Sequence, residues 1–436
     1  MKKFSIFQIT LLAVFGALAV SGVLIFAFAV GGGSKAALGP VTIWGTLPSG
    51  AFTTVLRQAA DADSQLNQVT YVQKDPSTYQ ADLTQALASG KGPDLFLITQ
   101  DYAIQDAGEI VPTPFKSFSQ SQFESTFADV ADSFIGTTGI EAVPIAADPL
   151  VLYWNKDMLS SAGYSQPPAY WDEISPMAQQ LSTKDDAGSL IKSAIDFGEY
   201  QNVDNAKDVL ATLILQAGGP ITFYDNAGKL ESDLVPKTGG TDVQQSTLNA
   251  LRFFTQFADP SKDYYSWNRS LPDAQAAFAA GDLALYVGYA SEEVQIERIN
   301  PNLNFAATAL PQIRGGARSL DTARVYALAA AKSGKNPSSA LTVAYVLNEP
   351  TNAAALSTAL GLPSPRRDLL GQTASGDPDL FNKMVIIGHS WADPDPEGTD
   401  TIFQAMIEDT TSGAVLISQA VSRADQQLSH LISQQQ

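Results

Sequence analysis

The segment PIAADPLVLYWNKDML, residues 144–159, places the carboxylate of Asp148 directly before an apolar run. The run, Leu150-Val151-Leu152, ends in the aromatic pair Tyr153-Trp154. A buried carboxylate that lacks a partner is costly. Asp148 therefore either lies in a surface turn, which the following Pro149 favours, or it meets a partner that the local sequence does not show.

The residues around this segment predict an alternation of strands and helices. Residues 41–44 and 95–98 are short apolar runs typical of strands, and residues 79–89 carry apolar side chains at helical spacing. Strand, helix and strand in this order indicate an α/β fold with right-handed crossovers. Further strands are predicted at 151–153, 283–287, 304–310 and 324–331, and further helices at 171–181, 203–217, 241–257, 272–280, 338–347 and 414–432.

Composition excludes several classes of protein. The chain has 436 residues, which suits two or three domains, and 45% of them are apolar. Its formal charge of −19 argues against a nucleic-acid partner, which would require a basic face. The chain has no cysteine, so it forms no disulfide and has no thiolate metal site, and we expect no cofactor and no metal.

The N-terminus predicts export and membrane anchoring. Two lysines precede a charge-free and almost wholly apolar stretch from Leu11 to Val30, long enough to span a bilayer. We expect an uncleaved single-pass transmembrane helix with the rest of the chain extracytoplasmic, followed by the glycine-rich tether 31–34. A cleaved signal peptide is the alternative, because Ala27-Phe28-Ala29 resembles a cleavage site.

Polar and aromatic residues follow several predicted strands. Trp44 and Thr46 follow the first strand, Asp101 follows residues 95–98, and Tyr289 and Ser291 follow residues 283–287. In open α/β sheets, the loops after the carboxyl ends of strands form the ligand crevice. This placement groups these residues as candidates for ligand contact.

A series of motifs then extends along the chain in a fixed order: GKGPDLFLI, VPIAADPLVLYWNKDMLSSAG, PPAYWDEI, AAFAAGDLALYVGYAS, NPNLNFAATALPQ and ARVYALA. Their order and spacing resemble the extracellular solute-binding proteins of ABC importers, in the sugar-binding family that includes maltose-binding protein. The resemblance implies a two-lobed, type II periplasmic-binding-protein-like fold with a central cleft. It implies an anchor and tether over 1–35, a first lobe of 40–147 with 305–348, and a second lobe of 148–304 with 349–436.

The resemblance also implies functions for individual residues. The chain would first cross between the lobes near Asp148, whose carboxylate would point into the cleft. Trp44, Thr46 and Asp101 match cleft positions, Ser291 falls where an aromatic ring stacks on sugar, and Tyr289 would substitute for that ring. Trp391, in the less similar C-terminal part, would supply another ring. Asn205 is either a helix N-cap or a cleft residue.

These residue types suit a sugar, because carboxylates accept its hydroxyl hydrogen bonds and flat rings cover its apolar faces. The expected protein is a monomeric, non-catalytic receptor that passes a carbohydrate, specifically an oligosaccharide, to ABC permease subunits. A glycan-acting enzyme that uses Asp101 and Asp148 as its carboxylate pair is one alternative, and an anchored sugar sensor is another. Residues Asp393, Asp395 and Glu397 are expected in a solvated loop.

Overall fold

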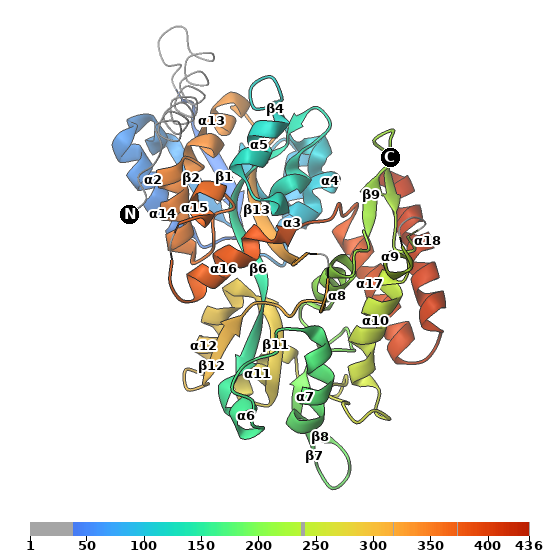
Figure 1. Ribbon diagram of the computed structural model, residues 1–436. Helices are drawn as coiled ribbons and strands as arrows, with labels where there is room; N and C mark the ends of the chain where they lie inside the picture. The colour runs from blue at the N-terminus through green and yellow to red at the C-terminus, as the bar shows by residue number, and fades with distance from the viewer. Residues whose placement is uncertain (1–37, 237–239, 317, 373, 436) are drawn as a thin grey trace, which may run out of the picture.

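The computed structural model describes residues 38–236, 240–316, 318–372 and 374–435. The expected membrane anchor, residues 1–35, lies outside them. Within the described part, no helix is both long and apolar enough to cross a membrane. The predicted α/β fold is confirmed: a ten-stranded mixed sheet runs through the described residues and helices pack around it (Figure 1).

The opening segment forms the centre of the long strand β6, Ala142–Asn155, in which every residue but Trp154 is buried. Residues 142–149 of β6 pair with β13, Asp321–Ala330, and residues 150–155 pair instead with β11, Leu283–Tyr289, and β12, Phe305–Thr308. Pro149 is the last residue paired with β13, and Leu150 is the first paired with β11. A proline has no N–H to donate to a sheet, so it is well suited to this exchange of partners.

The exchange divides the sheet into two parts that β6 connects (Figure 1). The first part has the order β2-β1-β3-β13-β6, and its parallel strands are β1, Val41–Gly45, β2, Val69–Gln73, and β3, Leu95–Thr99. The second part adds β8, Leu190–Ile195, and β7, Thr183–Lys184, beside β11. Asp148 therefore lies in a strand at the junction of the two parts, and its interpretation as a turn residue is wrong.

Alternating side chains of the first part cover opposite faces of the sheet. On β3, Leu95 and Leu97 belong to one apolar cluster, whereas Phe96 and Ile98 belong to another. Burial on both faces explains why this strand is a continuous apolar run. The helices of this part are α2 Ser49–Ala62, α3 Tyr79–Ala88, α4 Ala103–Asp106, α5 Gln120–Thr126, α13 Pro337–Leu347, α14 Pro350–Leu360 and α15 Arg367–Leu370.

A single larger apolar cluster surrounds the second part of the sheet. Trp171 and Trp267 are buried in it and Trp154 packs against it, so these three tryptophans serve packing. The helices of this part are α6 Lys156–Ser161, α7 Ile174–Leu181, α8 Ala206–Gln216, α9 Thr241–Gln244, α10 Ser246–Thr255, α11 Ala274–Ala280, α12 Glu293–Ile299, α17 Pro396–Thr411 and α18 Ile417–Gln435.

The remaining elements are short or connect the two parts. Helix α16, Asp377–Ile386, contributes Val385 to the first part's core and Phe381 to the second's. The short strands are β4 Thr113–Pro114 with β5 Gly139–Ile140, β9 Thr222–Tyr224 with β10 Leu230–Ser232, and β14 Gly388–His389 beside β13. The 3-10 helices are η1 Ser64–Gln68, η2 Gln100–Tyr102, η3 Ala107–Glu109, η4 Asp129–Phe134, η5 Trp171–Glu173, η6 Gln256–Ala258 and η7 Ala290–Glu292.

Two elements lie where the sequence did not place them. Strand β12, expected in the first lobe, pairs with residues 152–155 in the second part of the sheet. Helix α14, expected in the second lobe, packs on α2 of the first part. The chain therefore returns to the first part after β12 and leaves it for the last time near α16.

Candidate functional site

Charged residues meet where β6 and β13 run side by side at the junction. Asp148 on β6 lies directly opposite Arg324 on β13. The Arg324 guanidinium lies 4.1 Å from the centre of the Tyr289 ring, and its Nη2 is 3.9 Å from Oδ2 of Asp208 on α8. Three strands and one helix thus bring one cation, two carboxylates and one ring together.

Alternation along β13 explains how a charged residue fits into a core strand. Asp321, Ala323 and Val325 are buried, whereas Thr322, Arg324 and Tyr326 between them are only half-buried. Successive side chains of a strand point to opposite faces. The side chain of Arg324 is 37% exposed, so this face of β13 opens to solvent at the junction.

Asp148 is fully buried and only half of its carboxylate is hydrogen-bonded. Its Oδ1 accepts the backbone N–H of Ser291 at 2.9 Å, and its buried Oδ2 has no partner among the described residues. Burial raises the pKa of Asp148 to about 6, although hydrogen bonds from Ser291 and the charge of Arg324 oppose that rise. The free oxygen can accept a further hydrogen bond.

Replacement of Asp148 by asparagine tests this titration. A raised pKa means that the folded protein binds the proton more tightly than the unfolded chain between pH 3.8 and about 6. The contribution of Asp148 to stability is therefore present at low pH and is lost as the pH rises through about 6. Between pH 5 and pH 7.5, we expect the free energy of unfolding to decrease less in Asp148→Asn than in the wild type, in urea titrations. An identical decrease in both proteins would contradict a titrating Asp148.

Glu292 fixes the corner after β11 that carries Tyr289 and Ser291. Its Oε1 accepts the backbone N–H of Tyr289 at 2.9 Å and Nδ2 of Asn205 at 3.0 Å. Its Oε2 accepts Nε2 of Gln275 at 2.8 Å and the hydroxyl of Tyr286. One carboxylate therefore connects β11, α8 and α11 behind the site.

Glu292→Ala is expected to destabilise the protein by about 3 kcal/mol, because several buried donors would lose their acceptor. Urea unfolding monitored by circular dichroism measures this loss. Glu297→Ala, on the exposed side of α12, which begins directly after Glu292, is the matched control and should change stability by less than about 0.5 kcal/mol. Equal stabilities of the two variants would show that Glu292 does not hold the corner.

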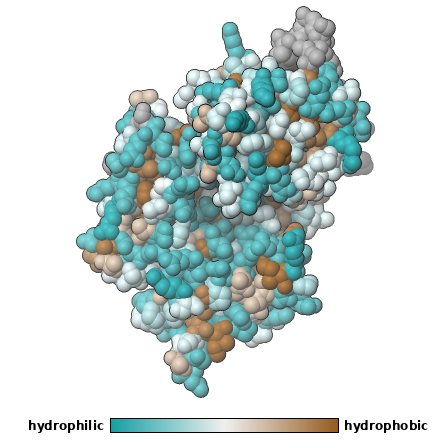
Figure 2. Space-filling view, turned by 180° about the vertical axis from the view of Figure 1, so that it is seen from behind, coloured by the Kyte–Doolittle hydropathy of each residue, from teal (hydrophilic) through white to brown (hydrophobic). Residues whose placement is uncertain are grey.

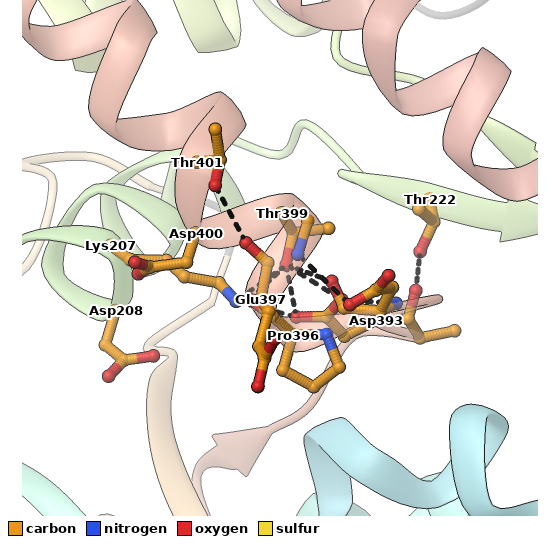
Figure 3. Close-up of polar contacts among 12 residues, drawn as sticks. Lys207, Asp208, Thr222, Asp393, Pro396, Glu397, Thr399, Asp400 and Thr401 are labelled. Carbon is orange, nitrogen blue, oxygen red and sulfur yellow. Dashed lines mark hydrogen bonds and ion pairs between the residues drawn. The ribbon is translucent and has the colours of Figure 1, made fainter.

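A buried ion pair ties α8 to the C-terminal segment (Figure 3). Nζ of Lys207 lies 2.8 Å from Oδ2 of Asp393 and 2.7 Å from Oγ1 of Thr399. Burial alone would lower the pKa of Lys207, but nearby carboxylates, chiefly Asp393, outweigh it and raise that pKa. Lys207 also lies 5.7 Å from the ring of Trp391, which stacks on Phe403. The pair thus holds the Trp391 loop in place.

Asp101 and Tyr102, which follow β3 in the first part of the fold, lie near the Lys207–Asp393 pair. Burial raises the pKa of Tyr102 to about 12, and the charges of Asp101, Glu397 and Asp393 add to the rise. The negative charge of Asp101 also raises the pKa of Arg324 and that of Lys207. Its buried Oδ1 has no hydrogen-bond partner among the described residues. Charges from both parts of the fold are therefore within electrostatic reach of one another.

The surface is hollowed at mid-height between the two parts, and hydrophilic residues surround the hollow (Figure 2). A pocket of about 390 Å³ spans the two parts, and its lining includes Pro394, the neighbour of Asp393 in the sequence. Ile104 of α4 lines it from the first part, and Tyr224 and Pro394 line it from the second. A ligand in the junction would thus have room to extend toward the β9–β10 hairpin.

A family model of the bacterial extracellular solute-binding proteins matches residues 58–382, about three quarters of the chain. The chain belongs to this family. Binding proteins of Brucella abortus (strain 2308) and Brucella suis biovar 1 (strain 1330) are each 23% identical to it over 244 residues. That match covers 54% of this chain and 54% of each relative, so the chain spans about half the length of the curated relatives it matches.

Solved structures share the fold of this solute-binding protein. A cyclo/maltodextrin-binding protein complexed with maltotetraose is 18% identical, with a TM-score of 0.72 over 92% of this chain and 99% of that one. A cyclic alpha-maltosyl-1,6-maltose binding protein from Arthrobacter globiformis is 17% identical, with a TM-score of 0.73 over 90% and 99%. A Thermotoga lettingae ABC transporter solute-binding protein bound with alpha-D-tagatose is 18% identical, with a TM-score of 0.68 over 90% and 99%.

In this solute-binding protein, the predicted site residues divide into two groups. Asp101, Asp148, Tyr289, Ser291 and Trp391 lie in or beside the charged group at the junction. Of the other three, Trp44 lies within β1 with Lys74 Nζ 3.6 Å from its ring, Thr46 follows that strand, and the Asn205 amide donates to Glu292.

Sequence reasoning missed the cations of the site, Arg324 and Lys207. Arg324 interrupts an apolar strand in ARVYALA, and a charge at that position is a signal that the side chain faces a cleft. Lys207 has no such signal, because its partner Asp393 is 186 residues away. The expectation that Asp393 is solvated is wrong: it is 2% exposed, because Lys207 and Thr399 replace water around it.

Proposed function

We propose that this protein is a non-catalytic receptor that captures a carbohydrate between two lobes and delivers it to an ABC permease. The unpartnered, buried Oδ2 of Asp148 at the junction is the observation that carries the proposal. Half-exposed rings at the site, Tyr102 and Trp391, add the flat surfaces that sugars require. The family and the sugar-bound proteins of the same fold support this function.

The lobes proposed here follow the sheet pairing and helix packing. The first lobe comprises 40–149 with 321–372 and β14, and the second comprises 150–308 with 390–435. β6, β13 and the segment around α16 connect the lobes, so a change of backbone angles near Pro149 would open or close the site. Asp148 and Arg324 lie on two of these connections, where a bound ligand would contact both lobes.

The globular part would work outside the cytoplasm as a monomer. A membrane anchor at residues 1–35 would keep it near its permease and raise the effective concentration of captured ligand. Permease subunits and the anchor belong to this proposal on the strength of the family and the apolar N-terminal sequence.

A thermal-shift screen against mono- and oligosaccharides tests the function. A ligand present at 100 times its Kd stabilises a protein by about 2.7 kcal/mol. We expect at least one saccharide to produce a shift of that size and to be recovered intact by chromatography. A saccharide cleaved by the protein would instead support the glycosidase alternative. Absence of a shift with every saccharide would contradict carbohydrate binding.

A further inference from the structure

The site contains more carboxylates than cationic side chains. Asp101, Asp148, Asp208, Asp393 and Glu397 lie within electrostatic reach of the junction, where they face Lys207 and Arg324. Asp106 acts on Tyr102 and Glu292 on Asp148 in the same way, so carboxylates outnumber the two cations. A neutral ligand would leave that excess uncompensated, and an anionic ligand would add to it.

The two cations neutralise particular carboxylates. Lys207 is committed to Asp393 at 2.8 Å, and Arg324 lies between Asp148 and Asp208. In Figure 3, the carboxylates of Asp208 and Glu397 both point to the same side, away from the Lys207–Asp393 network. Glu397 is exposed, and its charge acts on Tyr102 of the first lobe. The carboxylates of Asp208 and Glu397 therefore remain outside the Lys207–Asp393 pair.

Two oxygens of this acidic group are buried and have no partner. Oδ1 of Asp101 and Oδ2 of Asp148 lack hydrogen-bond partners among the described residues, and Asp148 is 0% exposed. A buried acceptor without a donor costs about 1–3 kcal/mol, and a charged one costs more. A hydroxyl would supply a donor without charge, whereas an ammonium supplies three donors and a positive charge.

We propose that the ligand is a saccharide that carries a protonated amino group, with the ammonium bound among the carboxylates of Asp101, Asp148 and Asp208. This inference rests on the proposed function and specifies its ligand. The net charge of −19 on the chain also favours a cationic ligand, because it attracts cations and repels uronic and sialic acids. Neutral hydroxyls of the same saccharide would bind toward the Tyr224 pocket.

Calorimetry with a matched set of ligands tests the proposal on the full chain. The set is a glucosamine trisaccharide, its N-acetylated form and the glucose trisaccharide of the same linkage. We expect the amine to bind at least tenfold more tightly than either neutral form, with an affinity that falls as salt screens the charges. Asp208→Asn and Glu397→Gln should each lower the ratio of amine to neutral affinity severalfold. Asp186→Asn, which removes an exposed charge in the β7–β8 turn, should leave the ratio unchanged.

The other outcomes separate this inference from the proposed function. A neutral trisaccharide that binds as tightly as the amine would overturn the inference and leave carbohydrate binding intact. A linear polyamine that binds as tightly as the amino sugar would overturn the saccharide part. An amine-to-neutral affinity ratio that is unchanged in both Asp208→Asn and Glu397→Gln would overturn the assigned position of the ammonium. Failure of all saccharides to bind would overturn both proposals.

Discussion

Replacement of Asp148 by alanine is expected to lower the affinity for the bound carbohydrate about 100-fold, equivalent to about 2.7 kcal/mol. The reason is the free Oδ2, which is buried at the junction and would accept charge-assisted hydrogen bonds from the ligand. Each such bond to a charged group contributes about 1.5–3 kcal/mol. Titration calorimetry with the saccharide that gives the largest thermal shift measures the change.

The unliganded Asp148→Ala protein should remain folded. Burial raises the pKa of Asp148 to about 6, so near neutral pH its charge is already unfavourable and its removal relieves that cost. Trp391→Ala provides a second test from the other lobe, because its half-buried ring would be lost while the charges remain. Wild-type affinity in both variants would show that the ligand binds elsewhere.

Lys207→Met is expected to destabilise the protein by about 3–5 kcal/mol, because it leaves Asp393 buried without its cation. The Lys207 side chain is 14% exposed and that of Asp393 is 1% exposed, so water would replace little of the lost interaction. Urea unfolding at pH 7.5 measures the loss.

The double variant Lys207→Met, Asp393→Leu controls for the lost charge pair. Removing both partners of a buried pair is often nearly neutral, so we expect it to recover most of the stability. Burial raises the pKa of Asp393 to about 6 even beside Lys207. The single variant should therefore lose less stability at pH 5, where Asp393 is protonated more readily. A loss that is the same for the single and double variants would mean that the ion pair does not hold the loop.

Elements with a strong local pattern could be predicted from the sequence. The apolar run 95–98 and the helix 79–89 appear as β3, Leu95–Thr99, and α3, Tyr79–Ala88. The sequence predicts β6 only at 151–153, because Pro144 and Pro149 resemble turn residues locally. Their positions in a strand become clear only from the neighbours that β6 exchanges at Pro149.

The site could be predicted only in part, for a related physical reason. Asp148 is identified by the conflict between a charge and an apolar segment, and that conflict is local. The pairs that define the site connect residues far apart in the sequence: Asp148 with Arg324 across two strands, and Lys207 with Asp393 over 186 residues. The polar composition of HSWADPDPEG predicts a solvated Asp393. This prediction is wrong, because Asp393 is buried in its ion pair with Lys207.

Hydrogen–deuterium exchange with and without saturating saccharide tests the central claim most directly, because it shows where the ligand binds without any substitution. We predict that the ligand slows exchange in segments of both lobes and their connections: 99–102, 146–152, 287–292, 322–326 and 391–399. A separate cavity of about 530 Å³ lies in the second lobe between Asn155, Lys192 and Asn304. Protection confined to that cavity, or to one lobe, would contradict a ligand held at the junction.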